Sequence, residues 1–528
     1  MCCGGMNAIG PPAMAAEGSN IVATVLDRRS DPKASPGVEI ARHDVEAVNR
    51  KVDREFYAKR QPIYPKRAHG KFRIVKWVVM AATLAIYYAL PWLRWSRGPD
   101  LPDQAVLLDM VNNRFFFLFL EIWPQEFYYV TGLLVLAALA LFLATALAGR
   151  VWCGYACPQT VWTDLMIAIE RFWQGDRNAR IRLDKEPWGA VKIVKKGMTH
   201  VSWLVVGILT GGALVFYFRD APTLARELMS GTAPTIAYLF LGIFAATTYL
   251  LGGIAREQVC IYMCPWPRIQ GAMTDSHTLL VGYKRERGEP RGSVRKGADG
   301  QIDWSNRGDC IDCKACVVVC PTGIDIRDGS QLECIQCALC VDACNDIMER
   351  IGRPRELIGY DTVARTDAVG RGQHEPFRPI RARTLLYAGL FGFVATIMLV
   401  AWSNRTLLDV NVLPDRVPPY VMLSDGSVRN SYTVKILNKL QERRTFHISV
   451  RDLPGAHLSV LGATDAAMAE VAVATDELRE VRLFVTLPPR ESRALTAAPQ
   501  NVTLVVTDQS SGRQSARHIV FLIPAPKP

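Results

Sequence analysis

The stretch CIDCKACVVVCP, residues 310–321, spaces four cysteines as C-x2-C-x2-C-x3-C and ends in proline. A second stretch, CIQCALCVDAC at residues 334–344, repeats this spacing, with Asn345 in the place of the proline. This is the cysteine run of bacterial ferredoxins. Three closely spaced thiolates wrap three corners of a cubane 4Fe-4S cluster, and a fourth thiolate comes from farther away. The duplicated run predicts a bacterial ferredoxin-like domain with two 4Fe-4S clusters.

In two-cluster ferredoxins the fourth cysteine of each run binds the cluster that the other run holds. The first cluster is therefore expected on Cys310, Cys313, Cys316 and Cys344. The second cluster is expected on Cys334, Cys337, Cys340 and Cys320. A structural zinc site would use two C-x2-C pairs a dozen or more residues apart, unlike these compact runs. Two neighbouring clusters conduct electrons, so the domain needs a donor and an acceptor.

The rest of the chain is dominated by blocks of apolar residues. Of the 528 residues, 49% are hydrophobic, and the net charge is +12. A helix needs about 20 apolar residues to cross a bilayer. Five nearly uncharged segments satisfy this length: 72–93, 127–148, 199–219, 236–255 and 382–402. They predict a multi-domain membrane protein with five α-helical spans. The basic residues form no stripe with interleaved aromatic residues, so nucleic acid is not expected as a partner.

Lysine and arginine are distributed unevenly among the loops. The loop from Arg150 to Lys196 holds nine of them, whereas the loops 94–126 and 220–235 together hold four. Cytoplasmic loops of membrane proteins are enriched in these residues. We therefore expect a multi-pass protein of the bacterial inner membrane. Its N-terminus and its clusters would be cytoplasmic, and the part after the fifth span would be periplasmic.

The segment after the fifth span alternates apolar and polar residues in short runs such as EVRLFVTLPP and NVTLVVTD. This pattern predicts a β-sandwich of the immunoglobulin-like kind. The polar N-terminal end is expected to be disordered, and it shows no signal peptide. The predicted domains are a disordered cytoplasmic tail at 1–60, a four-helix membrane region at 61–270, a ferredoxin domain at 271–380, a fifth span at 381–402 and the sandwich at 403–528.

Two further cysteine pairs follow the second and the fourth span. They lie in VWCGYACP, residues 151–158, and VCIYMCP, residues 259–265, which share the pattern C-x3-C-P. Proline disfavours helical angles in the residue before it and suits the first turn of a helix. Cys157 and Cys264 are therefore expected at helix N-caps, where the helix dipole favours thiolate. The helix after Pro158 should present one apolar face.

Thiolates are redox-active and are soft ligands that prefer copper(I). The pattern therefore marks Cys153, Cys157, Cys260 and Cys264 as one candidate site, with Met263 as a further copper ligand. The residues alone leave three chemistries open: a copper site, a redox dithiol, or a cluster bound by both pairs. Two inert cysteine pairs in packed turns would be the alternative without chemistry.

Other polar residues near the membrane are weaker candidates. His200 and His277 could be metal ligands, but lone interfacial histidines usually are not. Asp164 and Asp275 follow the two pairs and are expected to have structural roles. The chain shows no phosphate loop, no dinucleotide fingerprint and no nucleophile–base motif.

The stretches EIWPQEFYY, GRVWCGYACPQTVWTDL, CIYMCPWPRIQGAM and ERGEPRG, followed by the double ferredoxin run, resemble the CcoG family, also called FixG or RdxA. These bacterial inner-membrane proteins assist assembly of cbb3-type cytochrome c oxidase. The resemblance begins near residue 60 and extends into the C-terminal domain. It implies five spans, two 4Fe-4S clusters, an immunoglobulin-like periplasmic domain and reduction of copper(II) to copper(I).

Together the motifs and the resemblance predict an oxidoreductase that acts on metal ions, a cupric reductase with copper as substrate or ligand. Its partners would be the membrane, oxidase assembly factors and copper-handling proteins. The alternative is a general electron-transfer subunit between a quinol or cytoplasmic donor and a respiratory reductase. The electron donor, the copper recipient and the oligomeric state, including a homodimer, are left open.

Overall fold

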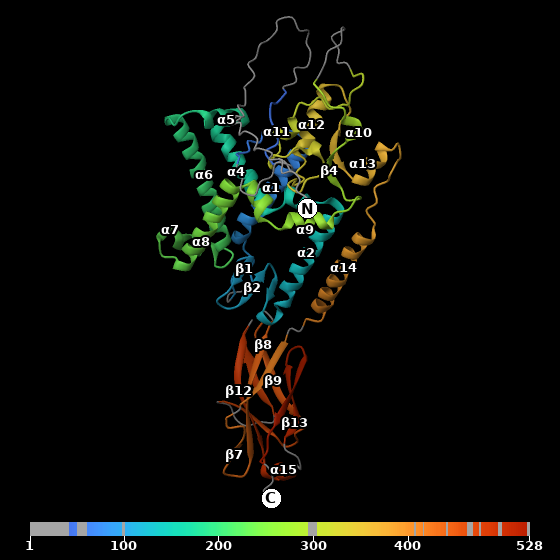
Figure 1. Cartoon of the computed structure of the whole chain (residues 1–528). Coiled ribbons are helices and arrows are strands. Elements are labelled where there is room, and N and C mark those ends of the chain that lie inside the picture. The colour runs from blue at the N-terminus through green and yellow to red at the C-terminus, as the bar shows by residue number, and fades with distance from the viewer. Residues whose placement is uncertain are drawn as a thin grey trace, which may run out of the picture. The chain divides into compact units, whose positions relative to one another are not determined.

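The computed structural model describes residues 42–49, 61–97, 101–293, 304–405 and, with short gaps, 408–524 (Figure 1). The chain forms two compact units. The first unit consists of Met1–Pro91 and Leu133–Gly392, and the second consists of Trp92–Gly132 and Phe393–Pro528. The cysteine runs and both cysteine pairs belong to the first unit.

Within the described residues, five helices are long and apolar enough to cross a membrane, as predicted. They are α1 (Lys71–Ala89) with its 3-10 extension η1 (Leu90–Trp92), α2 (Tyr128–Ala148), α6 (Ala190–Val215), α8 (Thr235–Thr247) with its π-helical extension η3 (Thr248–Ala255), and α14 (Ala382–Ser403). The third begins at Ala190 instead of residue 199, because a helix tolerates the lysines of its first turns. Lys192 is buried and donates to the carbonyl oxygens of Asp184 and Glu186, and Lys196 pairs with Asp184 at 2.5 Å.

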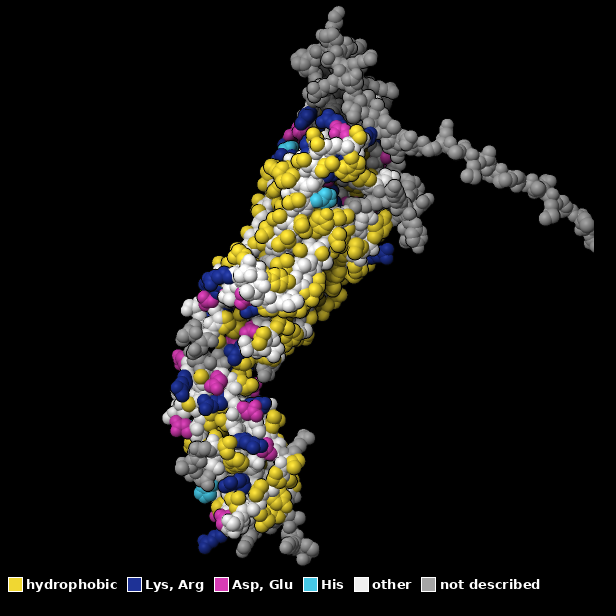
Figure 2. All heavy atoms as spheres, turned by 90° about the vertical axis from the view of Figure 1, so that its left-hand side faces the viewer, with side chains coloured by type: hydrophobic (Ala, Val, Ile, Leu, Met, Phe, Trp, Pro, Cys, Tyr) yellow, Lys and Arg dark blue, Asp and Glu magenta, His cyan; other side chains and the backbone are white. Residues whose placement is uncertain are grey.

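Apolar side chains cover the outward surface of α6 and α8. Val201, Leu204 and Ile208 on α6 and Leu239 and Ile243 on α8 are all exposed. Figure 2 shows a broad hydrophobic area on this face. Such a surface suits contact with lipid.

Shorter helices connect the spans. They are α3 (Val151–Tyr155), α4 (Pro158–Gln174), α5 (Arg177–Lys185), α7 (Ala221–Ser230), η4 (Val259–Met263, a π-helix) and α9 (Trp266–Met273). Cys157 is the N-cap of α4, as predicted. The same prediction for Cys264 is wrong. The N-cap of α9 is Pro265, which has helical angles, so the helix starts one residue later than in the first pair.

Helix α4 has its apolar residues on one face at helical spacing, as expected, and it also buries charge. Its buried side includes Asp164 and Glu170 beside Val161 and Met166, and Phe172 is 78% exposed. The buried carboxylates form ion pairs with arginines of other segments, so the side of α4 that packs on the protein is partly charged.

The ferredoxin part comprises β4 (Leu280–Tyr283), α10 (Arg285–Gly288), α11 (Ala315–Val318), η5 (Ile326–Asp328), α12 (Leu339–Arg350), β5 (Ile358–Asp361) and α13 (Val363–Gly370). Strands β4 and β5 pair antiparallel, with Leu280 opposite Asp361. The two cysteine runs have the same backbone. Asp312 and Lys314 in the first run, and Gln336 and Ala338 in the second, have φ between 51° and 57°. These left-handed residues curl each run tightly before α11 or α12 begins.

The first span is joined to the ferredoxin part by a helix cap. Gly70, the N-cap of α1, has no side chain to satisfy the orphan N–H groups of the first turn. Asp342 on α12 supplies the carboxylate and accepts hydrogen bonds from Phe72 N at 3.3 Å and Arg73 N at 2.7 Å. Figure 1 shows α1 and α12 close together.

Part of the N-terminal tail, which we expected to be mostly disordered, is described and lies on the ferredoxin part. Residues 42–49 lie on the ferredoxin part, where His43 N donates to Cys313 O and Asn49 N donates to Gly323 O, each at 3.1 Å. The side chain of Val45 packs among the buried residues around both cysteine runs. The polar composition of this segment gave no indication that it packs on the ferredoxin part. Residues 1–41 and 50–60 lie outside the described part.

The second unit contains the predicted β-sandwich. Its strands are β6 (Leu408–Pro414), β7 (Val421–Met422), β8 (Val428–Asn438), β9 (Arg444–Arg451), β10 (His457–Val460), β11 (Ala469–Val473), β12 (Leu478–Leu487), β13 (Gln500–Asp508) and β14 (Gln514–Phe521), with helix α15 (Pro489–Ala494) after β12. One sheet has the order β10-β12-β8-β6, with β7 on β8, and the other has β11-β9-β13-β14. Every pairing is antiparallel. Alternate residues such as Val434 and Ile436 of β8 and Ile448 of β9 fill the core.

The same unit holds a small sheet that the sequence did not lead us to expect. It consists of β1 (Val106–Asp109), β2 (Arg114–Phe117) and β3 (Leu120–Ile122), followed by the 3-10 turn η2 (Pro124–Glu126). Glu126 is buried and pairs with Arg405 at 2.7 Å and with Lys439 at 2.9 Å. The loop between the first two spans is therefore tied to the sandwich by buried charges.

Candidate functional site

Two cavities in the ferredoxin part are lined by cysteines. One is lined by Cys310, Cys313, Cys316 and Cys344, together with Tyr283 and Leu357. The other is lined by Cys320, Cys334, Cys337 and Cys340, with Cys316 and apolar residues such as Ile324 and Ile335. These are the two crossed sets expected from the sequence. Each set of four thiols with an apolar wall has the donors that a cubane cluster requires.

The arrangement suits a cluster better than a single ion. Among the described residues, no three His, Cys, Asp or Glu side chains converge as they would around one metal ion. A cubane binds each thiolate through a different iron atom, so its ligands need not converge. The donor sets therefore fit 4Fe-4S clusters and do not fit zinc.

Burial strongly disfavours free thiolates in these cavities. It raises the pKa of Cys334 to about 12, with Cys320 adding to the effect. It raises the pKa of Cys344 to about 12 as well, with Cys313 and Cys310 adding to the effect. Without a cation these thiols hold their protons, so binding of iron must release them.

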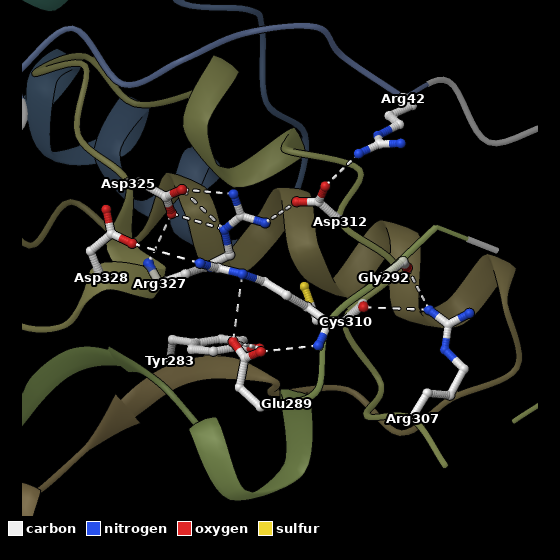
Figure 3. Close-up of polar contacts among 11 residues, drawn as sticks. Arg42, Tyr283, Glu289, Gly292, Arg307, Cys310, Asp312, Asp325, Arg327 and Asp328 are labelled. Atoms are coloured by element: carbon white, nitrogen blue, oxygen red, sulfur yellow. Dashed lines mark hydrogen bonds and ion pairs between the residues drawn. The ribbon is translucent and has the colours of Figure 1, made fainter. Parts of the chain in front are cut away.

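A chain of charges borders the first cavity (Figure 3). Arg327 lines this cavity, and its guanidinium group donates to Asp312 at 2.7 Å and to Asp325 at 2.7 Å. Arg42 from the N-terminal segment reaches the other oxygen of Asp312 at 2.6 Å. Burial alone would raise the pKa of Asp325, but the hydrogen bonds and charge of Arg327 outweigh it and lower that pKa. Our sequence reasoning considered only the cysteines and missed Arg327.

The first C-x3-C-P turn packs directly on the second cysteine run. A Cβ atom on Gly154 would lie 2.8 Å from Ile335 O and 2.9 Å from Gln336 O. Tyr155 interacts with Tyr360 through their hydroxyl groups, and Tyr360 donates to Gln336 O at 2.8 Å. Ile335 and Gln336 stand between Cys334 and Cys337. The turn therefore touches the loop that carries two of the expected ligands of the second cluster.

Thiols of both C-x3-C-P pairs lie on this side of the ferredoxin part. Cys153 is buried with Cys337, and Cys260 and Cys340 pack against the same group of residues. Burial raises the pKa of Cys260 to about 12, with Cys157, Cys153 and Cys264 adding to the effect. Cys260 is thus within electrostatic range of the other three thiols. Holding one ion with three or more of them would require their side chains to move, since none of the described residues converge in this way.

The two pairs are built differently. Cys153 Sγ donates to Gln270 Oε1 at 3.3 Å from an α-helical turn. Cys260 lies on a π-helix, η4, which follows Arg256, a residue with φ of 45°. The wider turns of π-helices are common at functional sites. Nothing in the C-x3-C-P pattern indicated that the two cysteine pairs would have different helical turns. Met263, expected as a copper ligand, is 62% exposed.

The remaining candidates have structural surroundings. Asp164 pairs with Arg73 at 2.9 Å and Lys76 at 3.8 Å, and Asp275 pairs with Arg381. Both aspartates thus lie in ion pairs, which suit the structural role expected for them. His200 Nδ1 lies 3.0 Å from the hydroxyl of Tyr249. Neither His200 nor His277 joins a group of possible metal ligands among the described residues.

The chain combines helices that can cross a membrane, a duplicated ferredoxin run and an immunoglobulin-like domain. These features define a membrane-bound iron–sulfur protein of the electron-transfer class. Family models support each part. A "4Fe-4S binding domain" matches residues 130–175, a "4Fe-4S dicluster domain" matches 255–363, and a domain described as an "IG-like fold at C-terminal of FixG" matches 398–524.

Relatives match nearly the whole chain. The nitrogen fixation protein FixG of Rhizobium meliloti is 47% identical, with 92% of this chain and 97% of that protein covered. Proteins RdxB and RdxA of Cereibacter sphaeroides are 50% and 49% identical, covering 88% and 82% of this chain and 97% and 90% of their own lengths. The chain belongs to the FixG/RdxA family.

Proposed function

We propose that this protein is a membrane-bound cupric reductase that assists assembly of the copper centre of cbb3-type cytochrome c oxidase. A donor in the cytoplasm supplies one electron for each copper(II), which becomes copper(I). The observation that supports this proposal most is the contact of the first C-x3-C-P turn with the loop between Cys334 and Cys337. Through this contact the thiols reach the electron-transfer domain without an intervening subunit.

The two clusters are assigned to the crossed cysteine sets. Cys310, Cys313, Cys316 and Cys344 hold the first, and Cys334, Cys337, Cys340 and Cys320 hold the second. When bound, each cluster stores and releases one electron. The apolar walls exclude water from the thiolates, and Cys316 stands between the two cavities that it lines. Cys153, Cys157, Cys260 and Cys264 receive copper, because thiolates prefer copper(I), the product.

The orientation follows from the loop charges. The N-terminus and ferredoxin part face the cytoplasm, and the sandwich faces the periplasm of a bacterial inner membrane. Copper leaves toward oxidase assembly factors and copper-handling proteins. The second candidate function is electron transfer from a quinol to a respiratory reductase. Its support is the lipid-facing surface of α6 and α8, from which a quinol could approach.

A single-turnover experiment tests the proposal. Anaerobically purified protein is reduced, freed of reductant and mixed with copper(II) and a chelator that colours only with copper(I). We expect one copper(I) per stored electron and a matching bleach of the iron–sulfur absorbance. Serine at Cys153 and Cys157 should abolish the reaction while leaving the iron content unchanged. Cys2→Ser with Cys3→Ser is the matched control and should react normally.

The outcomes separate the two functions. Reduction of the iron–sulfur absorbance by a quinol, without copper(I) formation, would favour the second candidate. Serine at both C-x3-C-P pairs should do no more harm than serine at one pair, because residues acting as one unit are not additive. If a variant of either C-x3-C-P pair lost four iron atoms, the group bound by these thiols would be a third cluster and not copper.

A further inference from the structure

Arg150 is a buried cation at the junction between the second cysteine run and the C-x3-C-P thiols. In the chain, Arg150 stands two residues after the end of α2 at Ala148, and it is 6% exposed. Its backbone N donates to Gln336 Oε1 at 2.9 Å. Its Nη1 donates to Cys334 O at 2.9 Å and to the carbonyl oxygen of Leu332. Arg150 is thus fixed to the loop that carries the expected ligands of the second cluster.

No carboxylate within the described part of the chain forms an ion pair with Arg150, and its buried Nε has no hydrogen-bond partner there. The other buried arginines of the first unit are paired. Arg73 has Asp164, Arg180 and Arg256 share Glu170, and Arg327 has Asp325. A buried charge without a counter-charge is strongly destabilising. Arg150 therefore differs from these arginines, because no described carboxylate lies within ion-pair distance of its side chain.

Thiols that can become anionic lie on both sides of Arg150. Arg150 interacts electrostatically with Cys334 on one side and with Cys153 and Cys260 on the other. Thiolates, alone or around a metal centre, carry net negative charge. Each electron added to the second cluster adds one more negative charge to the set of thiolates that includes Cys334, whose carbonyl oxygen accepts from Arg150.

We propose that Arg150 is the residue that sets the reduction potential of the second cluster and makes it the better electron acceptor of the two. This inference rests on the proposed function, because it requires both clusters to be bound. A fixed positive charge stabilises the reduced, more negative state and so raises the potential. Arg327 at the first cluster differs, because Asp312 and Asp325 compensate its charge. Electrons then run from the first cluster to the second and on to the thiols.

The test is a redox titration of both clusters by electron paramagnetic resonance in the intact, detergent-solubilised protein. Arg150→Gln should lower the potential of the second cluster alone, by about tenfold in its reduced-to-oxidised ratio, or about 59 mV for a one-electron couple. Arg150→Lys keeps the charge and should keep the potential. Arg327→Gln should lower only the potential of the first cluster. Arg350→Gln, an exposed residue paired with Asp346, should shift neither.

Three results would overturn the inference: equal shifts of both clusters in Arg150→Gln, no shift at all, or a shift in Arg150→Lys as large as in Arg150→Gln. If Arg150→Gln fails to retain iron, the decision rests on Arg150→Lys. An unchanged reduction potential of the second cluster in Arg150→Lys supports the inference, and a lowered potential overturns it. The iron content of the unaltered protein separates this from the proposed function. Without two clusters the proposed function fails, whereas two clusters with unmoved potentials reject only the role of Arg150.

Discussion

A Cβ atom on Gly154 would lie 2.8 Å from the carbonyl oxygen of Ile335, closer than real Cβ contacts come. Gly154 stands between the two cysteines of the first C-x3-C-P pair, and Ile335 stands between two expected ligands of the second cluster. Glycine at this position lets the two redox segments touch backbone to backbone. Any other residue would force them apart.

Gly154→Ala should therefore slow copper(I) formation while both clusters stay bound. Misplacement by about 1 Å can cost up to 10²-fold in rate, and we expect a loss on the order of tenfold or more. Stopped-flow measurement of the iron–sulfur bleach by copper(II) gives the rate. Gly212→Ala on α6 is the control, because a Cβ atom there meets nothing within 4 Å. A Gly154→Ala protein as fast as the control would show that this contact is not the electron path.

The crossed ligand sets predict which cysteine variants resemble one another. Cys320→Ser and Cys334→Ser should each lose four iron atoms and leave the same resonance spectrum, that of the first cluster. Cys344→Ser and Cys313→Ser should leave the spectrum of the second cluster. Iron analysis and low-temperature spectra of anaerobic protein check this. If Cys320→Ser instead matches Cys313→Ser, each run keeps its own fourth cysteine.

The buried ion pairs of Glu126 should make the stability of the second unit depend on pH. Burial alone would raise the pKa of Glu126, but hydrogen bonds from Arg405 and Lys439 outweigh it, and the pKa lies below its usual value. The stabilisation is thus complete above the usual glutamate pKa and is lost as the pH falls through the lower, folded-state value.

Glu126→Gln should then destabilise this unit by about 3 kcal/mol at neutral pH, because it leaves two buried cations without a counter-charge. The mutant and the parent should become alike at acidic pH. Thermal unfolding of the solubilised protein, followed by β-sheet circular dichroism, measures both effects. Glu470→Gln is the control, since the side chain of Glu470 is 66% exposed. A mutant penalty that persists undiminished at low pH would contradict the ion-pair explanation.

Loop charges predict the orientation in the membrane. A reporter that is active only in the periplasm should work when fused to the C-terminal end and fail when fused near residue 300. A cytoplasmic reporter should give the opposite pattern at the same two positions. Activity of the periplasmic reporter at residue 300 would place the cysteine runs outside the cytoplasm.

Strong local patterns made much of this fold predictable. The apolar blocks gave the five helices, and the alternation of residues such as Val434 and Ile436 gave the sandwich. The spacing of the cysteine runs predicted the two sets of four cysteines that line the two cavities. Arg150, Gly154 and Asp342 could not be found in this way. Each acts through a partner far along the chain, and long-range packing leaves no periodic signal in the sequence. The prediction of an N-cap at Cys264 was wrong for a local reason, since Pro265 has helical angles and is itself the N-cap of α9.

Asp342 also couples the expected cluster ligands to the first span. It lies on α12 between Cys340 and Cys344, which belong to different expected clusters, and it completes the first turn of the first span. A change at either of these cysteines that displaces α12 would therefore also remove the hydrogen bonds that cap α1. The start of the first membrane helix thus depends on a residue 270 positions further along the chain.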